Sequence, residues 1–183
     1  MAVPRHAPTE ITCPCGAVAF ALDGDPILAA ECHCTSCREA GERLEALPGA
    51  APIRAPNGGT PFALWRKDRV RCLRGAEHLR SLRLTPDAPT ERVVATCCNA
   101  PMYLSFRHGH WISFYAKRWP DGIGPAPAER TMTGDRPDRA ALADDIPNSR
   151  RWSARFFAKL LWAWARMGFR NPKVADVKGE LNA

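Results

Sequence analysis

Seven of the eight cysteines in this 183-residue chain fall into three tight clusters, and this clustering constrains the fold more than any other feature. The first two clusters have the spacings C-x-C and C-x-C-x-x-C, and the third is a pair of adjacent residues. Such close spacings bring several thiolates to one ion, and zinc is the metal that sites of this kind usually hold. The sequence therefore predicts a zinc protein whose candidate ligands are Cys13, Cys15, Cys32, Cys34, Cys37, Cys97 and Cys98.

Whether these cysteines bind metal or form disulfides depends on the cellular compartment of the protein. Residues 1–12 have no apolar stretch of the kind that a secretory signal requires, and no apolar run approaches the roughly 20 residues of a membrane-spanning helix. We therefore expect a cytoplasmic protein. Because a reducing compartment keeps thiols free, we expect the cysteines to bind metal rather than to form disulfides. Redox-active thiols and structurally incidental cysteines are the alternatives.

The composition, with 45% hydrophobic and 25% charged residues, is that of a soluble globular protein with one core. The net charge of +7 raises the question of nucleic-acid binding. However, the basic residues are spread through the chain, and aromatic residues are not interleaved with them as in RNA-binding motifs. These observations argue against a nucleic-acid partner and favour a solvated basic surface, with one exception near the C-terminal end.

Short apolar runs separated by polar turns predict β-strands up to about residue 115. The first strand leaves a Cys-Gly turn within residues 11–22, the second covers residues 27–32, and a short helix is expected over residues 38–47. Later strands are predicted at residues 62–65, 70–73, 79–84, 93–96, 102–106 and 111–115. Residues 120–149 are rich in proline and poor in large apolar side chains, which predicts an irregular linker or arm. We thus expect a mainly antiparallel β domain over residues 1–119, the arm over residues 120–149, and a helix and tail over residues 150–183.

The order of the cysteine motifs resembles that of a known family. C-x-C-G, then C-x-C-x-x-C, then a late cysteine before a Pro-containing turn is similar to the glutathione-dependent formaldehyde-activating enzyme and centromere protein V family. The run Cys97-Cys98-Asn99-Ala100-Pro101 is similar to the Cys-Cys-Asn-Thr-Pro hallmark of an uncharacterised subgroup. The similarity covers about residues 12–114. It implies a mainly β, Mss4-like, zinc-stapled antiparallel fold, to which this chain adds a C-terminal amphipathic helix.

The resemblance also implies two zinc sites. Cys13, Cys15 and Cys98 would belong to a structural site, and the C-x-C-x-x-C cysteines would hold a second zinc near the substrate. The chain departs from the family at Ala95, where the family has a further cysteine. Cys97 is then either the fourth ligand of the structural site, which a backbone turn after Cys98 would allow, or the fourth ligand of the second site.

Three thiolates at Cys32, Cys34 and Cys37 would leave one zinc position for a water or a substrate sulfur, which is typical of catalytic zinc. A coordinated thiol such as glutathione is held as its thiolate, so the matching activity is that of a carbon-sulfur lyase acting on thiol adducts. The alternative is a closed zinc site, completed by Cys97 or a histidine, in a non-catalytic interaction module. His33 lies within this cluster, but its neighbours would point away from it in an extended segment, so we interpret it as a non-ligand.

Residues 150–170 have the pattern of a basic amphipathic helix. One face would carry Trp152, Phe156, Leu160, Trp164 and Met167. Another face would carry Arg151, Arg155, Lys159, Arg166 and Arg170. We expect the helix to pack on the β domain or on a second subunit, because Phe157, Leu161 and Trp162 widen the apolar face. Attachment to an anionic membrane surface or to an acidic partner is the alternative.

Overall fold

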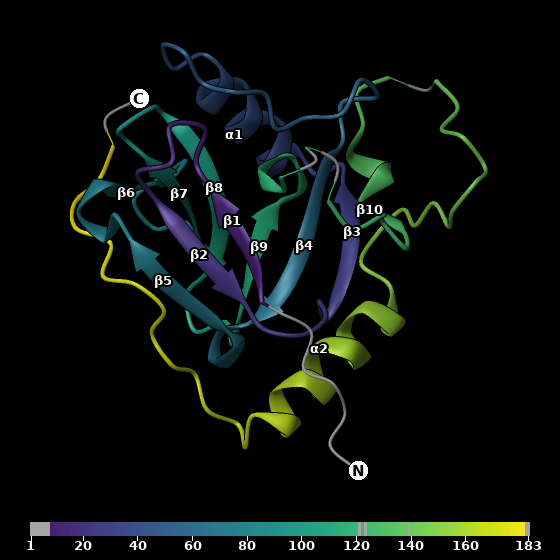
Figure 1. Cartoon of the computed structure of the whole chain (residues 1–183). Helices are drawn as coiled ribbons and strands as arrows, with labels where there is room; N and C mark the ends of the chain where they lie inside the picture. The colour runs from purple at the N-terminus through teal and green to yellow at the C-terminus, as the bar shows by residue number, and fades with distance from the viewer. Residues whose placement is uncertain (1–7, 121, 123, 139, 182–183) are drawn as a thin grey trace.

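The structure is a computed structural model that describes residues 8–120, 122, 124–138 and 140–181. It contains two β-sheets and two α-helices (Figure 1). The smaller sheet has the strand order β1-β2-β5 and the larger sheet has the order β10-β3-β4-β9-β8-β7-β6. All pairs are antiparallel except β10 with β3. The elements are β1 (Thr9–Thr12), β2 (Ala19–Leu22), β3 (Leu28–Cys32), α1 (Thr35–Glu45), β4 (Thr60–Arg66), β5 (Val70–Arg74), β6 (Leu79–Leu82), β7 (Thr90–Ala95), β8 (Ala100–Phe106), β9 (Trp111–Tyr115), β10 (Arg130–Thr131) and α2 (Ala154–Arg166).

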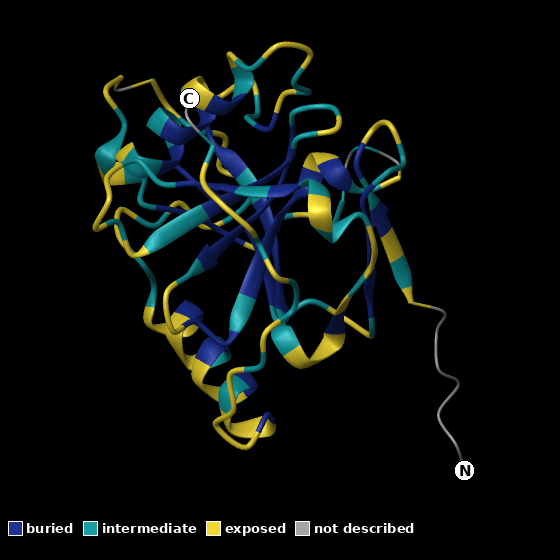
Figure 2. Ribbon diagram, turned by 90° about the vertical axis from the view of Figure 1, so that its left-hand side faces the viewer, coloured by how far each residue is buried: buried dark blue, intermediate teal, exposed yellow. Residues whose placement is uncertain are grey.

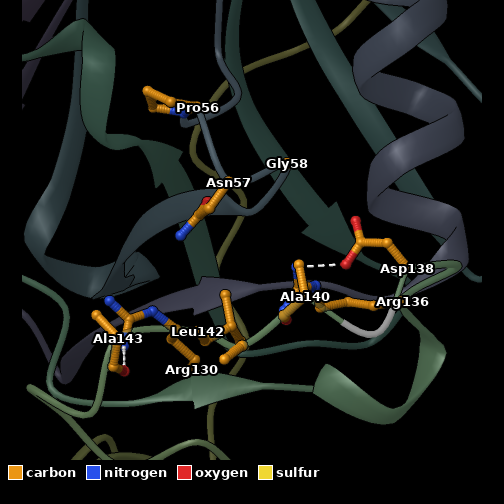
Figure 3. A pocket seen from close by; sticks show the side chains of 10 residues that line it. Pro56, Asn57, Gly58, Arg130, Arg136, Asp138, Ala140, Leu142 and Ala143 are labelled. Atoms are coloured by element: carbon orange, nitrogen blue, oxygen red, sulfur yellow. Dashed lines mark hydrogen bonds and ion pairs between the residues drawn. The ribbon is translucent and has the colours of Figure 1, made fainter.

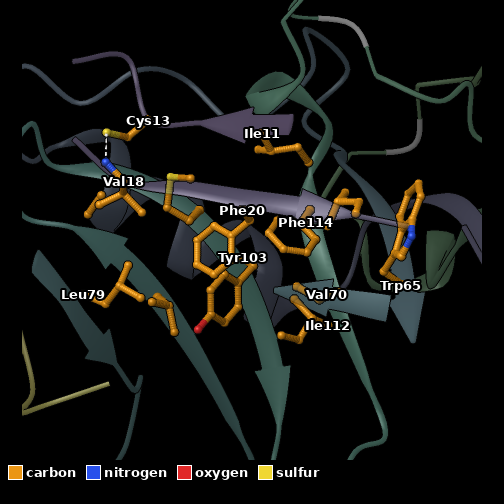
Figure 4. Close-up of a cluster of buried hydrophobic side chains, with 14 of the residues drawn as sticks. Ile11, Cys13, Val18, Phe20, Trp65, Val70, Leu79, Tyr103, Ile112 and Phe114 are labelled. Atoms are coloured by element: carbon orange, nitrogen blue, oxygen red, sulfur yellow. Dashed lines mark hydrogen bonds between the residues drawn. The ribbon is translucent and has the colours of Figure 1, made fainter. Parts of the chain in front are cut away.

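The main core lies between the two sheets. Phe20 on β2 makes edge contacts with Tyr103 on β8 and with Phe114 on β9, with ring centroids 5.6 Å apart in both pairs. Cys13 is buried at one end of the same cluster, where its Sγ accepts a hydrogen bond from the Val18 N–H (Figure 4). The first cysteine motif is therefore anchored directly on the core.

The other face of the larger sheet packs against both helices. Helix α1 buries Cys37, Ala40, Gly41 and Leu44, a spacing of three and four residues that defines one helical face. Helix α2 buries Phe156 and Leu160 in the same cluster. Because the sheet is covered on both faces, all five positions of β3 are buried, with Glu31 as the one charged residue among them. The strands at the centre of the molecule are mostly buried in the same way (Figure 2).

The predicted fold class is confirmed: the chain is mainly β with a C-terminal amphipathic helix. Most strand boundaries differ from the prediction by one to three residues, and two differences affect the cysteine motifs. Residues 11–22 form the end of one strand, a turn and a second strand, because the Cys-Gly turn folds β1 back onto β2. Helix α1 begins at Thr35 rather than residue 38, because Cys34 caps its N-terminus.

Residues 120–149, predicted as an irregular arm, include the short strand β10 at the edge of β3. Residues 1–7, part of the segment in which we predict no secretory signal, lie outside the described residues. None of the helices in the described part of the chain is both long and apolar enough to cross a bilayer.

A carboxylate at the end of α1 fastens the following loop. Glu45 Oε1 accepts hydrogen bonds from the N–H groups of Ile53 and Arg54, both at 2.9 Å, and its Oε2 accepts one from Arg54 Nε at 2.9 Å. Burial raises the pKa of Glu45, but these hydrogen bonds outweigh it and the net pKa is lowered. The carboxylate is therefore ionised at neutral pH.

Glu45→Gln is expected to lower the free energy of unfolding at pH 7 by about 1 kcal/mol, because it weakens a charge-assisted hydrogen-bond set. Urea denaturation measures the difference. Glu39→Gln is the matched control, since Glu39 makes only an exposed ion pair with Arg43 and should change stability by less than about 0.5 kcal/mol. Equal effects of the two substitutions would contradict the anchoring role of Glu45.

Candidate metal centres

Four cysteines from two distant segments come together at one end of the core. Cys13 and Cys15 follow β1, and Cys97 and Cys98 lie in the turn between β7 and β8. The four Sγ atoms lie within 4.8 Å of one another. Their separations include 3.4 Å for Cys13 to Cys15, 3.7 Å for Cys13 to Cys97, 3.4 Å for Cys15 to Cys97 and 4.0 Å for Cys97 to Cys98. A tetrahedral zinc with bonds of about 2.3 Å needs sulfur separations of about 3.8 Å. The group therefore fits a four-thiolate metal ion without rearrangement.

The backbone explains how adjacent cysteines reach one point. Asn99 has a left-handed conformation, with φ of 51°, and its side-chain amide donates to the Pro48 carbonyl at 3.0 Å. This turn prevents Cys97 and Cys98 from pointing to opposite faces as they would in a strand. On the other side, Gly16 has φ of 77° and its N–H donates to the Cys13 carbonyl at 2.9 Å, which closes the turn that brings Cys15 over Cys13.

A second group spans the junction between β3 and α1. Cys32 is the last residue of β3, Cys34 is the N-cap of α1, and Cys37 lies in its first turn. Their three Sγ atoms also lie within 4.8 Å of one another. Cys32 and Cys37 are buried, whereas Cys34 is half-buried and gives this group its exposed side. No fourth cysteine, histidine, aspartate or glutamate of the described residues joins the group.

The helix N-terminus favours a thiolate at Cys34. The Cys37 N–H donates to Cys34 Sγ at 3.3 Å, and the helix dipole adds a positive potential at this end. Hydrogen bonds from the thiols of Cys32 and Cys37 lower the pKa of Cys34. The hydrogen bond with Cys34 raises the pKa of Cys32, and the hydrogen bonds with Cys32 and Cys34 raise the pKa of Cys37. Cys34 is thus the thiol of this group that ionises most readily.

One exposed thiol of the four-cysteine group, that of Cys15, has a lowered pKa. A hydrogen bond from the Ala17 backbone, helped by the neighbouring thiols, lowers the pKa of Cys15 to about 7. Burial and the nearby sulfur atoms raise the pKa of Cys97 and of Cys98. Both groups therefore contain one readily ionised thiol from which metal binding can begin.

A buried arginine lies close to the three-cysteine group. Arg92 on β7 is 1% exposed, and its guanidinium donates to the Ser36 hydroxyl at 2.6 Å, the Ser36 carbonyl at 3.2 Å and the Thr90 hydroxyl at 3.1 Å. These acceptors are neutral, and no carboxylate of the described residues forms an ion pair with Arg92. A buried cation without a counter-charge is costly. Ser36 lies between Cys34 and Cys37 in the sequence, so the guanidinium lies beside the cysteine group, and its charge makes a small contribution to the lowered pKa of Cys34.

This arrangement suits a divalent ion held by three thiolates, whose net charge of −1 would be balanced by Arg92. Arg92→Met is therefore expected to weaken zinc binding at the three-cysteine group by about tenfold to a hundredfold, the usual effect of removing a group that supports metal ligands. Competition with a chromophoric chelator measures the affinity. Arg92→Lys keeps the charge and should lose much less, and equal losses in the two variants would show that charge is not what matters.

His33 is turned away from the sulfur atoms. Its Nε2 hydrogen-bonds Glu31 Oε1 at 2.9 Å, and the same oxygen accepts from Asn57 Nδ2 at 2.9 Å and Arg130 Nε at 3.1 Å. Burial raises the pKa of Glu31, but hydrogen bonds from His33 and Asn57 and the Arg130 charge lower it overall. Since no nitrogen of His33 lies among the atoms that could share a metal with the cysteines, the histidine belongs to a buried ion-pair network behind the group.

A surface cavity of about 510 Å³ opens beyond this network (Figure 3). Both arginines that line it are already paired, Arg130 with Asp145 at 2.7 Å and Arg136 with Asp138 at 2.6 Å. None of its described lining residues is a cysteine, so the cavity is not part of either cysteine group. The lining residues are Pro56, Asn57, Gly58, Arg130, Arg136, Asp138, Ala140, Ala141, Leu142 and Ala143.

The structure brings all seven candidate ligands into these two groups and leaves Cys72 outside both. Cys97 lies with Cys13 and Cys15, the first of the two positions that the sequence left open. Sequence reasoning missed Arg92 and Glu31. The burial of Arg92 could have been predicted, because strand alternation places its side chain on the same face as that of the buried Val94.

A mainly antiparallel β fold with two cysteine groups at strand ends defines a protein with two candidate metal centres. Residues 8–48, which contain five of the seven clustered cysteines, match the family model of the glutathione-dependent formaldehyde-activating enzyme. The resemblance predicted from the order of the cysteine motifs is thus confirmed over these residues.

Two other comparisons add no evidence about function. The crystal structure of a Rhodobacter sphaeroides protein, a Northeast Structural Genomics target, is 21% identical, covers 67% of this chain and 99% of its own, and superposes with a TM-score of 0.44. None of the curated proteins compared with the chain matches it.

Proposed function

We propose that this chain is a zinc protein whose four-cysteine group is structural and whose three-cysteine group makes or breaks carbon-sulfur bonds in thiol adducts of the glutathione type. One observation carries the proposal: three sulfur atoms converge on a point to which no fourth metal-binding side chain of the described residues contributes. A position left to solvent or substrate is what separates catalytic from structural zinc.

The chemistry follows from the donor set. Zinc held by three thiolates lowers the pKa of a fourth, exogenous thiol and keeps it as a thiolate at neutral pH. In the forming direction, the substrate thiolate would add to the carbon of a carbonyl compound, and the carbonyl oxygen would take up a proton from water, which balances the proton that the thiol released on binding. In the breaking direction, the hydroxyl group would lose its proton, the carbonyl would re-form, and the carbon-sulfur bond would cleave to leave the thiolate. Both directions balance without an oxidant or a reductant.

Residues around the three-cysteine group would support this reaction. Cys34 is the half-buried member of the group, so a small thiol would approach from its side. The buried Arg92 offsets the negative charge that three thiolates and an incoming fourth would accumulate. The Glu31–His33–Arg130 network holds the end of β3 rigidly, which keeps Cys32 and Cys34 in register with α1.

Cobalt substitution tests the open position. The cobalt protein is titrated with glutathione, and the thiolate-to-cobalt absorption is followed; saturable growth of this band is expected at millimolar thiol or below. S-methylglutathione, which has no free thiol, should leave the spectrum unchanged. A spectrum that does not respond to glutathione in the fully loaded protein would contradict an open site and favour a closed, structural one.

The alternative function is a non-catalytic zinc-binding module that acts through its surface. It is favoured by one feature, the exposed apolar face of the C-terminal helix. The cobalt experiment separates the two functions, because only the first requires a thiol to enter the metal sphere.

A further inference from the structure

Helix α2 has two apolar faces. The inner face packs on the larger sheet through Phe156, Leu160, Ala163 and Met167, all of which are buried. The outer face presents Phe157, Leu161 and Trp162 to solvent, with 55%, 59% and 67% of their surfaces exposed. Only two other large apolar side chains of the described residues are comparably exposed, and one of these, Phe169, directly follows the same helix.

The outer face contains no charged residue across its width. At 100° per residue, the positions between Phe157 and Trp162 on the far side from the core are occupied by Ala154, Leu161, Ala165 and Ala158. A basic row then follows along one flank, formed by Arg155, Lys159 and Arg166. Apolar side chains beside a row of basic ones are the pattern of a helix that lies in a membrane interface.

The helix is held in place, so its outer face is a fixed surface. His110 Nε2 donates to the Leu160 carbonyl at 2.9 Å, and the His110 ring stacks on Trp164 with centroids 5.5 Å apart. Beyond the helix, Lys67 Nζ donates to Asn171 Oδ1 at 3.2 Å. Packing of the inner face therefore accounts for the attachment of α2 to the core. The outer apolar strip stays exposed, and its one ring contact is that of Phe157 with Phe156 of the same helix, at 5.9 Å between centroids.

The charge of the molecule is concentrated at this helix. Residues 146–175 contain seven arginines and lysines and no aspartate or glutamate. The whole chain has 26 basic and 19 acidic residues, a net charge of +7, so the rest of the chain carries equal numbers of each. Three of these seven basic residues lie in α2 itself and the other four lie in the segments on either side of it. The outer face of α2 thus combines exposed apolar side chains with an excess of positive charge nearby.

The apolar side chains and the positive charge together indicate which kind of partner the outer face of α2 can bind. A second copy of the chain would bring two sets of seven positive charges together, which opposes association through this face. An acidic peptide would satisfy the charges, but a polar partner would leave Phe157, Leu161 and Trp162 exposed to water. A planar layer of anionic lipid accepts a convex helix, takes up Phe157, Leu161 and Trp162 at the level of the headgroups, and neutralises the basic row.

We infer that the outer face of α2 is a docking surface for an anionic lipid bilayer, on which the protein binds peripherally. With 13 residues, the helix is about 20 Å long and would lie in the plane of the interface. Helix α1 and the three-cysteine group lie at the end of the molecule opposite α2 (Figure 1), so the cysteine group stays open to solvent when the helix is docked. This role is independent of the reaction proposed above.

The test is sedimentation of the full-length, zinc-loaded protein with large vesicles of phosphatidylcholine and phosphatidylserine. We expect binding that rises with the phosphatidylserine fraction, falls at least tenfold when salt is raised from 50 to about 500 mM, and is absent with phosphatidylcholine alone. Leu161→Ser should lower vesicle affinity by about tenfold, because it removes one inserted side chain. Leu73→Ser is the matched control: the same substitution at a site on β5 that is 46% exposed should leave affinity unchanged.

Three outcomes would overturn the inference. They are no binding to phosphatidylserine vesicles at low salt, equal binding by Leu161→Ser and the wild type, and vesicle-independent dimerisation in the ultracentrifuge that Leu161→Ser abolishes. Binding to polyglutamate without binding to vesicles would likewise assign the face to an acidic partner. Because Leu161 contacts solvent, its substitution leaves the fold intact, which the circular dichroism spectrum and melting temperature of each variant verify.

Discussion

Cys15→Ser is expected to release one zinc ion and to lower the free energy of unfolding by about 5 kcal/mol or more. The four-cysteine group joins the turn after β1 to the turn after β7, more than 80 residues away in sequence. Binding of a structural zinc contributes about 10–16 kcal/mol in small zinc domains, and this is folding free energy, since the unfolded chain has no such site. A domain with a stability of about 5–15 kcal/mol would then unfold largely at 37 °C. Zinc analysis and thermal denaturation measure the two effects.

Cys72→Ser is the matched control for this substitution. Cys72 lies outside both groups, and its Sγ makes only a long contact of 3.5 Å with the Arg74 carbonyl. This variant should keep its zinc and nearly all of its stability. If Cys15→Ser retained full zinc content and the wild-type melting temperature, Cys15 would not be a ligand.

The second large effect is expected at Cys34→Ser, and it should be selective. Serine is a good helix N-cap, so its hydroxyl can replace Sγ as the acceptor of the Cys37 N–H, and α1 should persist. The three-cysteine group, however, would lose the thiolate that initiates metal binding. We expect the variant to contain one zinc instead of two, to fold, and to lose the response of the cobalt protein to glutathione.

The selectivity of this loss is what distinguishes a reactive site from a structural one. Unfolding of Cys34→Ser to the same extent as Cys15→Ser would assign a structural role to the three-cysteine group. Unchanged zinc content would remove Cys34 from the ligands altogether.

Most of the cysteine grouping could be predicted because the cysteines of each motif lie within a few residues of one another in the sequence. The spacings C-x-C and C-x-C-x-x-C are short enough to bring Cys13 to Cys15, and Cys32 to Cys37, close together in almost any compact turn. The mainly β architecture followed from apolar runs bounded by polar turns in the same way. The position of Cys97 required more, namely the left-handed turn at Asn99, which depends on its contact with Pro48 from a different part of the chain.

The surroundings of the three-cysteine group could not be predicted, because they come from distant segments. Arg92 meets Ser36 across 56 residues, and Arg130 meets Glu31 across 99 residues. No periodicity links such pairs. The amphipathic pattern of α2 identified the helix, and α2 does pack on the β domain. The reason given for this packing is wrong, because Phe157, Leu161 and Trp162 face solvent while Phe156 and Leu160 face the sheet.

The central claim is that each cysteine group holds a zinc ion. It is tested most directly by measuring the zinc content of protein purified under reducing conditions without chelators, by inductively coupled plasma mass spectrometry against an amino-acid analysis of the same sample. We expect two zinc ions per chain, of which one is lost in Cys34→Ser. A zinc content near zero, in a protein that is folded and has all eight thiols reduced, would contradict it.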